Sequence, residues 1–524
     1  MSQPYTITTA ISYPNGRPHI GHAYEVIATD AIARFQRMMG RDVFFQTGTD
    51  EHGLKMAQTA RDRGMEPRAL ADEMSSYFKD MNDGLNISHD RFIRTSEADH
   101  HRASQALWQA MEASGDLYLG RYEGWYSVRD EAFYDEKELA EGEGGEKLSP
   151  QGTPVEWTVE ESWFFRLSAY QQKLLDLYAS QPDFIQPDSR RNEIMRFVEG
   201  GLSDLSVSRT SFDWGVKVPG SAESGQLHVM YVWVDALTNY LTGCGYPDDA
   251  QRMARYWAEG GDITHIIGKD IVRFHTVYWP AFLMSAKLPL PRKVFGHGFL
   301  LNRGEKMSKS VGNVADPMEL ADRFGVDQLR YFLLSEVTFG NDGSYSAEAI
   351  VARSNSDLAN SFGNLAQRTL SFIAKNLEGR VPEPASQDVD GDLLATVAQA
   401  GQAFQAAMAD LAPSVAIEAW MRAVFACNAY IDAQAPWALR KTDVARMEAV
   451  LATLYEAIGN LAIMIQPVIP ASAAALLDQM GLAQEGRTYA AIGSGWYAEL
   501  RATGFTLAPP KPLFPRLELT EADA

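Results

Sequence analysis

Hydrophobic and polar positions in the first 50 residues follow two alternating patterns. Residues 5–11 are largely β-branched, residues 12–18 are rich in turn formers, and residues 23–39 carry apolar side chains at helical spacing before Gly40. Residues 42–47 repeat the strand-like pattern. A strand, a turn, a helix and a second strand in this order predict a βαβ unit and therefore a parallel sheet.

Residues 120–160 interrupt this alternation. The run from Glu141 to Glu146 is acidic and rich in glycine, a composition typical of a flexible excursion. We therefore place an α+β insertion at residues 116–224. Strand-like runs return at residues 227–233 and 263–267. The simplest interpretation is one α/β domain in two halves, residues 1–115 and 225–300, that the insertion separates.

A different pattern begins near residue 347. From there to residue 480 glycine and proline are sparse and apolar residues recur at helical spacing, as at Leu365, Leu370 and Ile373. This pattern predicts an α-helical bundle, and we assign residues 347–524 to it. Residues 301–346 link the two regions. The proline-rich tail, residues 509–516, is expected to pack back along the surface.

Composition bounds the function more loosely. A chain of 524 residues suggests two to four domains, and 46% hydrophobic with 22% charged residues is typical of a soluble globular protein. The formal net charge of −21 argues against a nonspecific nucleic-acid binder, although a locally basic site could still bind a specific RNA. Most of the acidity is explained by solubility alone.

Three features favour a cytoplasmic protein. The N-terminus lacks the basic and apolar segments of a secretory signal. The apolar stretches, such as residues 461–465, look too short to span a bilayer. One disulfide between Cys244 and Cys427 is arithmetically possible, but two buried thiols in a reducing compartment are the plainer interpretation.

The first chemical signal is His19-Ile20-Gly21-His22, directly after the first strand and turn. A helix that begins here would present unpaired backbone N–H groups and a positive dipole end to an anion. Gly21 has no Cβ to hold a nucleotide away, and the histidines can donate hydrogen bonds to phosphate oxygens. Isolated histidines are more often structural, but four specified residues at this place in a βα unit favour a nucleotide site.

The second signal is Lys306-Met-Ser-Lys-Ser310, preceded by the polar, glycine-containing segment 302–305. Lysines on such a loop can stabilise charge that develops on a triphosphate in a transition state. Alone, two lysines in five residues would more often mean a solvated basic loop. The sequence contains no P-loop pattern, and we find no strong case for a nucleophilic catalytic triad.

Together, the two signals resemble the two signatures of class I aminoacyl-tRNA synthetases. The segments 10–16, 49–53, 231–237 and 267–275 are similar to those of the methionyl-tRNA synthetase family. This resemblance implies a Rossmann-type catalytic domain that activates methionine with ATP and transfers it to methionine tRNAs, both initiator and elongator. The implied catalytic residues are His19, His22, Lys306 and Lys309. The implied ATP site adds Gly21 and Ser308.

The same resemblance implies a methionine pocket. Asp50 would bind the ammonium group, since a carboxylate is its natural partner. The expected lining residues are Ile11, Tyr13, Trp233, Ala236, Leu237, Tyr240, Ile271 and His275. Aromatic walls suit a polarizable thioether, and a Tyr240–His275 pair would lie near the sulfur. Each aromatic residue could singly be core packing, and Leu237 departs from the proline of many family members.

A third group of residues resembles the family's anticodon site. Asn364 and Arg368 are four residues apart and would share one helix face, where they could contact base edges. Trp437, after Pro436, could stack on an unpaired base. Because proline favours an extended residue before it, a helix boundary is expected there.

Departures from related enzymes narrow the alternatives. The insertion lacks cysteine, so we expect no zinc, no other bound metal, and ATP as its Mg²⁺ complex. It is too small for the editing domain of the leucine, isoleucine and valine enzymes, and the cysteine enzyme uses a zinc site. A noncatalytic tRNA-binding relative is disfavoured because both ATP signatures are intact. No appended tRNA-binding domain follows the helical domain, so we expect a monomer.

Overall fold

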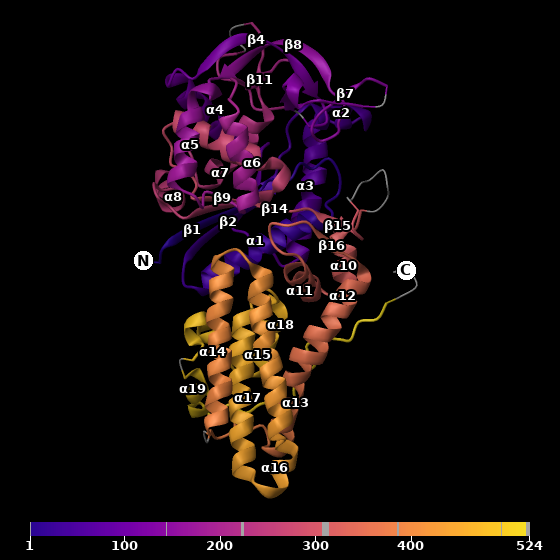
Figure 1. Ribbon diagram of the computed structural model, residues 1–524, viewed down its shortest axis with the longest axis vertical. Helices are drawn as coiled ribbons and strands as arrows, with labels where there is room; N and C mark the ends of the chain where they lie inside the picture. Colours follow the sequence, from indigo (N-terminus) through magenta and orange to yellow (C-terminus); the bar gives the residue numbers. More distant parts are fainter. Residues whose placement is uncertain are drawn as a thin grey trace.

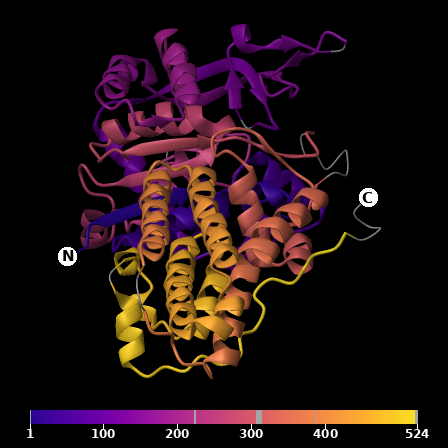
Figure 2. The same ribbon diagram turned by 60° about the horizontal axis from the view of Figure 1, so that its bottom comes forward.

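The computed structural model describes residues 2–130, 132–142, 144–221, 225–305, 314–384, 387–493 and 495–519. An α/β body lies at the centre of the molecule, with the antiparallel insertion above it and a long helical bundle below it (Figure 1). The tail after the last helix runs back along the bundle (Figure 2). Asn355 exchanges two hydrogen bonds with the backbone of Leu517, at 2.8 and 2.9 Å, which confirms that the tail packs on the surface.

Six strands, all paired in parallel, form the sheet of the body in the order β3-β2-β1-β13-β14-β9. The strands are β1 (Pro4–Thr9), β2 (Asp42–Thr49), β3 (Arg91–Arg94), β9 (Ile185–Gln186), β13 (Ile263–Gly268) and β14 (Lys293–His297). Strand β1 pairs with β2 on one side and with β13, from beyond the insertion, on the other. The expected parallel sheet, interrupted and then completed, is confirmed.

Helices flank this sheet on both faces. Helix α1 (Ile20–Met38) follows β1 and begins three residues before the predicted start, because His19 caps its first turn. The other helices of the body are α2 (Leu54–Asp62), α3 (Pro67–Gly84), α4 (Ala98–Ala113), α7 (Val232–Gly243), α8 (Ala250–Tyr256), α9 (Trp279–Ser285), α10 (Pro317–Phe324) and α11 (Val326–Glu336).

The expected strand at residues 227–233 is mostly wrong. Only β12 (Val229–Met230) is extended, and it pairs with β11 (Ser208–Arg209) outside the main sheet. Helix α7 begins at Val232, and every residue from Val234 to Gly243 is buried. A helix that is buried on all sides shows no polar face, so its apolar run is indistinguishable from a strand by periodicity.

The insertion also departs from its predicted bounds. Strand β9, at Ile185–Gln186, is the edge strand of the parallel sheet, and it lies between α5 (Gln171–Ser180) and α6 (Asp188–Glu199). The antiparallel sheet of the insertion has the order β10-β8-β4-β5. Its strands are β4 (Leu117–Ser127), β5 (Ala132–Tyr134), β8 (Glu156–Phe165) and β10 (Leu205–Ser206). The acidic excursion is instead a short hairpin of β6 (Ala140–Glu141) and β7 (Lys147–Leu148).

The helical region begins with one continuous rod. Helix α12 (Ala347–Arg353) continues through the π-helical segment η5 (Ser354–Gly363) into α13 (Asn364–Asn376). The bundle that follows confirms the expected α-helical fold. It comprises α14 (Asp388–Ala409), α15 (Pro413–Gln434), α16 (Pro436–Thr442), α17 (Val444–Ile465), α18 (Pro470–Gln479) and α19 (Trp496–Ala502).

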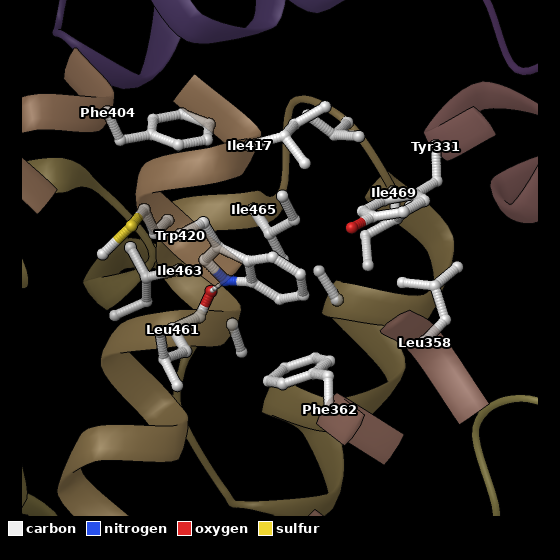
Figure 3. Packing of buried hydrophobic residues seen from close by; sticks show 14 of the residues in the cluster. Tyr331, Leu358, Phe362, Phe404, Ile417, Trp420, Leu461, Ile463, Ile465 and Ile469 are labelled. Atoms are coloured by element: carbon white, nitrogen blue, oxygen red, sulfur yellow. Dashed lines mark hydrogen bonds between the residues drawn. The ribbon is translucent and has the colours of Figure 1, made fainter. Parts of the chain in front are cut away.

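Helix α17 is the central helix of this bundle. Contrary to the expectation from sequence, it is long and apolar enough to cross a membrane. However, 89% of its most apolar stretch of 18 residues is buried inside the protein. Figure 3 shows the core beside it, where the Trp420 ring lies between Phe362 of η5 and Ile417, and its Nε1–H donates to the Leu461 carbonyl at 3.0 Å. These contacts identify α17 as a core helix.

A buried ion pair joins the bundle to the body. The Arg330 guanidinium of α11 donates to Asp30 of α1 at 2.6 Å and to the carbonyls of Pro467 and Val468, both at 3.0 Å, between α17 and α18. Arg330 and Asp30 are both fully buried. Because the buried guanidinium is bonded to both regions, it fixes α1 against the bundle.

Candidate active site

A cavity of about 550 Å³ opens at the carboxyl ends of β1, β2, β13 and β14. This edge is where parallel α/β sheets bind ligands. Every predicted ATP-site and methionine-site residue within the described part of the chain lines it: Ile11, Tyr13, His19, Gly21, His22, Asp50, Trp233, Ala236, Leu237, Tyr240, Ile271 and His275. Segments far apart in the sequence therefore meet at one place.

His19 and His22 form a reciprocal cap at the start of α1. The Nδ1 atom of His19 accepts from the Gly21 N–H, and Nδ1 of His22 accepts from the His19 N–H, both at 3.1 Å. The two rings lie 3.9 Å apart between centroids. Because each Nδ1 accepts a hydrogen bond, the proton of each neutral ring is on Nε2. Both imidazoles are thereby oriented as hydrogen-bond donors through Nε2.

The opposite end of the cavity is aromatic. Trp233 stacks on Phe274 with a centroid distance of 3.8 Å, and the ring of His275 lies 6.2 Å from Trp233. The Tyr240 hydroxyl lies 2.7 Å from Nε2 of His275, so the expected pair is present. Phe274 was not among the predicted residues, although it precedes His275 in the same segment.

The protonation states of this pair follow from its burial. Burial lowers the pKa of His275 to about 4, and it raises the pKa of Tyr240 well above its usual value. Nδ1 of His275 lies 3.0 Å from the Ile271 carbonyl. A carbonyl can only accept, so the proton of the neutral ring is on Nδ1 and Nε2 is the acceptor. Near neutral pH the Tyr240 hydroxyl therefore donates to a neutral His275, and the pair carries no charge.

Asp50 lies at the end of β2, between the two halves of the cavity. Its side chain is buried, with 8% of the residue exposed, and its backbone N–H donates to the Ser12 carbonyl at 2.9 Å. That bond joins the ends of β1 and β2. A carboxylate beside the aromatic end of the cavity is suited to an ammonium group.

Two of the three predicted anticodon residues, Arg368 and Trp437, are in contact, and Trp437 belongs to α16, at the far end of the bundle (Figure 1). The Arg368 guanidinium lies 5.3 Å from the centre of the Trp437 ring and bonds Asp432 at 2.9 Å. Asn364 is exposed one turn before Arg368, and Trp437 is 44% exposed. A helix boundary does occur before Pro436, but Ala435 is left-handed, with φ 43°, rather than extended as expected. This conformation ends α15 and starts α16 within one residue.

Comparisons with known proteins agree with this geometry. A family model described as class I tRNA synthetases (M) matches residues 5–370, and a model of the anticodon-binding domain of methionyl tRNA ligase matches residues 381–523. The methionine–tRNA ligase of Brucella suis biovar 1 is 59% identical over 522 residues, 99% of each chain. The chain belongs to the methionyl-tRNA synthetase family. The Mycobacterium bovis enzyme is 56% identical over 98% of each chain.

Solved structures of this family extend the likeness to three dimensions. The Mycobacterium tuberculosis methionyl-tRNA synthetase in complex with methionyl-adenylate has a TM-score of 0.93 at 56% identity, covering 98% of this chain and 100% of that one. The free form of that enzyme has a TM-score of 0.87 at 52% identity, covering 99% of each chain.

Several cavity residues escaped the sequence analysis. Glu25 of α1 and His297 of β14 are paired across the cavity wall at 2.8 Å. Burial raises the pKa of Glu25. Burial alone would lower the pKa of His297, but its hydrogen bond to Glu25 raises that pKa above its usual value. Glu25 lies one turn after His22, and this spacing was the only local signal for it. No pattern linked it to His297, which is remote in the sequence.

The insertion contributes to the same cavity. Arg129, Asp130 and Gln151 line it, although the sequence analysis assigned no site residue to the insertion. The lysine loop cannot be placed in the same way, because Lys306, Ser308 and Lys309 lie outside the described residues. The described strand β15 (Leu300–Asn302) pairs with β16 (Gly343–Tyr345), and its first residue, Leu300, lines the cavity. Within the described chain no group of metal-binding side chains is found.

Proposed function

We propose that the chain activates L-methionine with ATP in this cavity and transfers it to the 3′-terminal adenosine of methionine tRNAs. In the first step a carboxylate oxygen of methionine attacks the α-phosphorus of ATP. A new P–O bond forms, the bond to the bridging oxygen breaks, and pyrophosphate leaves. In the second step a ribose hydroxyl of the terminal adenosine attacks the carbonyl carbon of the adenylate; an ester bond forms, the C–O bond to the phosphate breaks, and AMP leaves. The observation that carries the proposal is the meeting of every described candidate residue for ATP and methionine in one cavity.

The amino-acid end has the chemistry of methionine. The Asp50 carboxylate takes the ammonium group, and the aromatic walls around Trp233 take the flexible thioether. The Tyr240–His275 pair is fully bonded and neutral, so the sulfur meets a polarizable surface and no buried charge. Ile11, Tyr13, Ala236, Leu237 and Ile271 complete the wall.

The nucleotide end begins at His19, Gly21 and His22. The N-terminus of α1 and the two Nε2 donors favour the phosphates of ATP, which enters as its magnesium complex. Glu25 and Asp270 line the same region, and acidic groups repel phosphates but accept hydrogen bonds from ribose hydroxyls. Lys306, Ser308 and Lys309 would act on the charge of the leaving pyrophosphate. The methionyl-adenylate in the related M. tuberculosis structure supports this substrate pair.

The far end of the bundle supports the tRNA half of the proposal. The Arg368 guanidinium, which bonds Asp432, lies against the Trp437 ring, and the ring is exposed enough to receive a base. Asn364 and Arg368 would contact base edges. We further infer that the protein is cytoplasmic, monomeric and free of zinc, as its composition and its cysteine-free insertion suggest.

One substitution tests the amino-acid half directly. Asp50→Asn should raise the KM for methionine in pyrophosphate exchange at least tenfold and leave the KM for ATP nearly unchanged, because a hydrogen bond to a charged group contributes about 1.5–3 kcal/mol. Asp42→Asn is the matched control, since Asp42 begins the same strand and bonds Arg255 away from the cavity. Equal kinetics for Asp50→Asn and the wild type would refute the assignment of Asp50.

A further inference from the structure

Helix α7 carries a polar stripe beside its pocket residues. Asp235, Asn239 and Gly243 are four residues apart, so they share one face of the helix. Trp233, Ala236 and Tyr240 line the cavity, and so does Asn239. We call the stripe Asp235, Asn239 and Gly243 the α7 seam. Its partners lie on β2, on the loop that follows β2 and on α4.

The middle and the end of the seam contact one glutamine. The Nε2 atom of Gln46, on β2, donates to the Asn239 carbonyl at 2.9 Å and to its Oδ1 at 2.6 Å. Gly243 is packed so closely that a Cβ there would lie 1.3 Å from Oε1 of Gln46. Gln46 and Asn239 are almost completely buried. Helix α7 therefore has one position along β2 that keeps these bonds.

The start of the seam is a buried carboxylate between two histidines. Oδ2 of Asp235 lies 2.7 Å from Nδ1 of His52, and Oδ1 lies 2.7 Å from Nε2 of His100 on α4. Nδ1 of His100 lies 3.0 Å from the Thr242 hydroxyl, so α4 is bonded to both ends of α7. Although burial would raise the pKa of Asp235, the two histidines hold it well below its usual value. Asp235 is thus an ionised, buried group with both carboxylate oxygens hydrogen-bonded.

The loop between β2 and His52 also makes hydrogen bonds to segments other than α7. Glu51 is completely buried and accepts from Arg94 at 2.6 and 3.1 Å, and from the Ser96 hydroxyl. The Trp214 indole donates to the Glu51 carbonyl at 2.6 Å and packs edge-on against His52. Asp50 is the residue before Glu51. The bond between His52 and Asp235 therefore joins the loop that carries Asp50 to α7.

We propose that the α7 seam sets the length of amino-acid side chain that the cavity accepts. If Asp50 takes the ammonium group, as proposed above, the two ends of the substrate are held by two chain segments that the seam joins. Residues from α7 hold the thioether end. Loosening the seam changes the distance between these ends and leaves the chemistry at each end intact. Asp235 is a positioning residue, since it does not line the cavity.

The test compares methionine with ethionine, its S-ethyl homologue, in ATP–pyrophosphate exchange. An apolar pocket distinguishes one methylene by roughly 10–200-fold in kcat/KM. Asp235→Asn should lower this preference at least fivefold, through the KM for the amino acid rather than the KM for ATP. Asp390→Asn is the matched control, because Asp390 is an equally buried carboxylate bonded to Arg446 in the bundle. It should keep the wild-type preference.

A second variant tests the other end of the seam without removing a charge. Gly243→Ala must displace the Gln46 amide, so it should also lower the preference at least fivefold, and it decides the matter if Asp235→Asn does not fold. An unchanged preference in the folded variants, or an equal fall for both amino acids, would overturn the role of the seam. A wild-type protein without methionine-dependent exchange would instead overturn the proposed function itself.

Discussion

Replacing Trp437 by alanine should separate amino-acid activation from tRNA charging. The ring is 44% exposed at the far end of the bundle, whereas the cavity lies in the α/β body (Figure 1). Its described neighbour is the Arg368 guanidinium, 5.3 Å from the ring centre. A cation–π contact at an exposed site contributes only about 0.5–1 kcal/mol, so the variant should fold normally.

The effect on tRNA should be larger than this loss of stability. Stacking of one base on an aromatic ring contributes about 1–3 kcal/mol, which corresponds to roughly 5- to 150-fold in affinity. We therefore expect at least a tenfold loss in kcat/KM for charging methionine tRNA.

The assay compares pyrophosphate exchange with charging for the wild type, Trp437→Ala and Trp437→Phe. Exchange should be the same in all three, and phenylalanine, which keeps a stacking face, should restore most of the charging. A minihelix that lacks the anticodon should be charged equally by all three proteins. Equal losses of exchange and charging in Trp437→Ala would show that the ring is structural, and unchanged charging would remove it from the recognition site.

Three further predictions concern the catalytic half. Lys309→Ala should slow single-turnover adenylate formation on the order of a hundredfold and leave methionine binding unchanged, because one donor to transition-state charge is lost; a normal rate would refute its role. Metal analysis of the purified protein should find no stoichiometric zinc, since residues 116–224 contain no cysteine, and one tightly bound zinc per chain would contradict this. The pKa of His275 falls from 6.5 unfolded to about 4 folded, so below pH 6.5 the unfolded chain binds a proton that the folded protein does not. The free energy of unfolding should therefore decrease by about 3 kcal/mol between pH 6.5 and 4, and denaturant unfolding of His275→Gln should lack this component; an identical decrease would exclude His275 as its source.

The pattern of polar and apolar residues was sufficient to predict a helix or strand where the element has one polar and one apolar environment. Helix α1 and strands β1 and β2 could be predicted because a turn and a cap separate them. Helix α7 could not, since its residues from Val234 onward are buried on every side. Strand β9 could not either, because two residues inside an insertion carry no periodicity and gain their structure only from pairing with β14.

The candidate site followed the same division. His19 and His22 belong to one short contiguous motif, so their residue types and their place after a strand pointed to a nucleotide site, whereas Asp50 was predicted from the resemblance of residues 49–53 to the methionyl-tRNA synthetase family. The Glu25–His297 pair and Arg129 needed the fold, because they reach the cavity from a helix, a distant strand and the insertion. The α7 seam was equally hidden. Asp235 lies two residues after the run that was expected to be a strand, and its partners His52 and His100 come from two other segments.

Exchange of labelled pyrophosphate into ATP tests the central claim most directly. The purified chain should catalyse this exchange when methionine is added, and it should do so far more slowly with leucine, isoleucine, valine or cysteine at the same concentration. That result would assign adenylate formation to this protein and methionine to its cavity. Absence of methionine-dependent exchange in the folded protein, or faster exchange with another of these amino acids, would contradict the account.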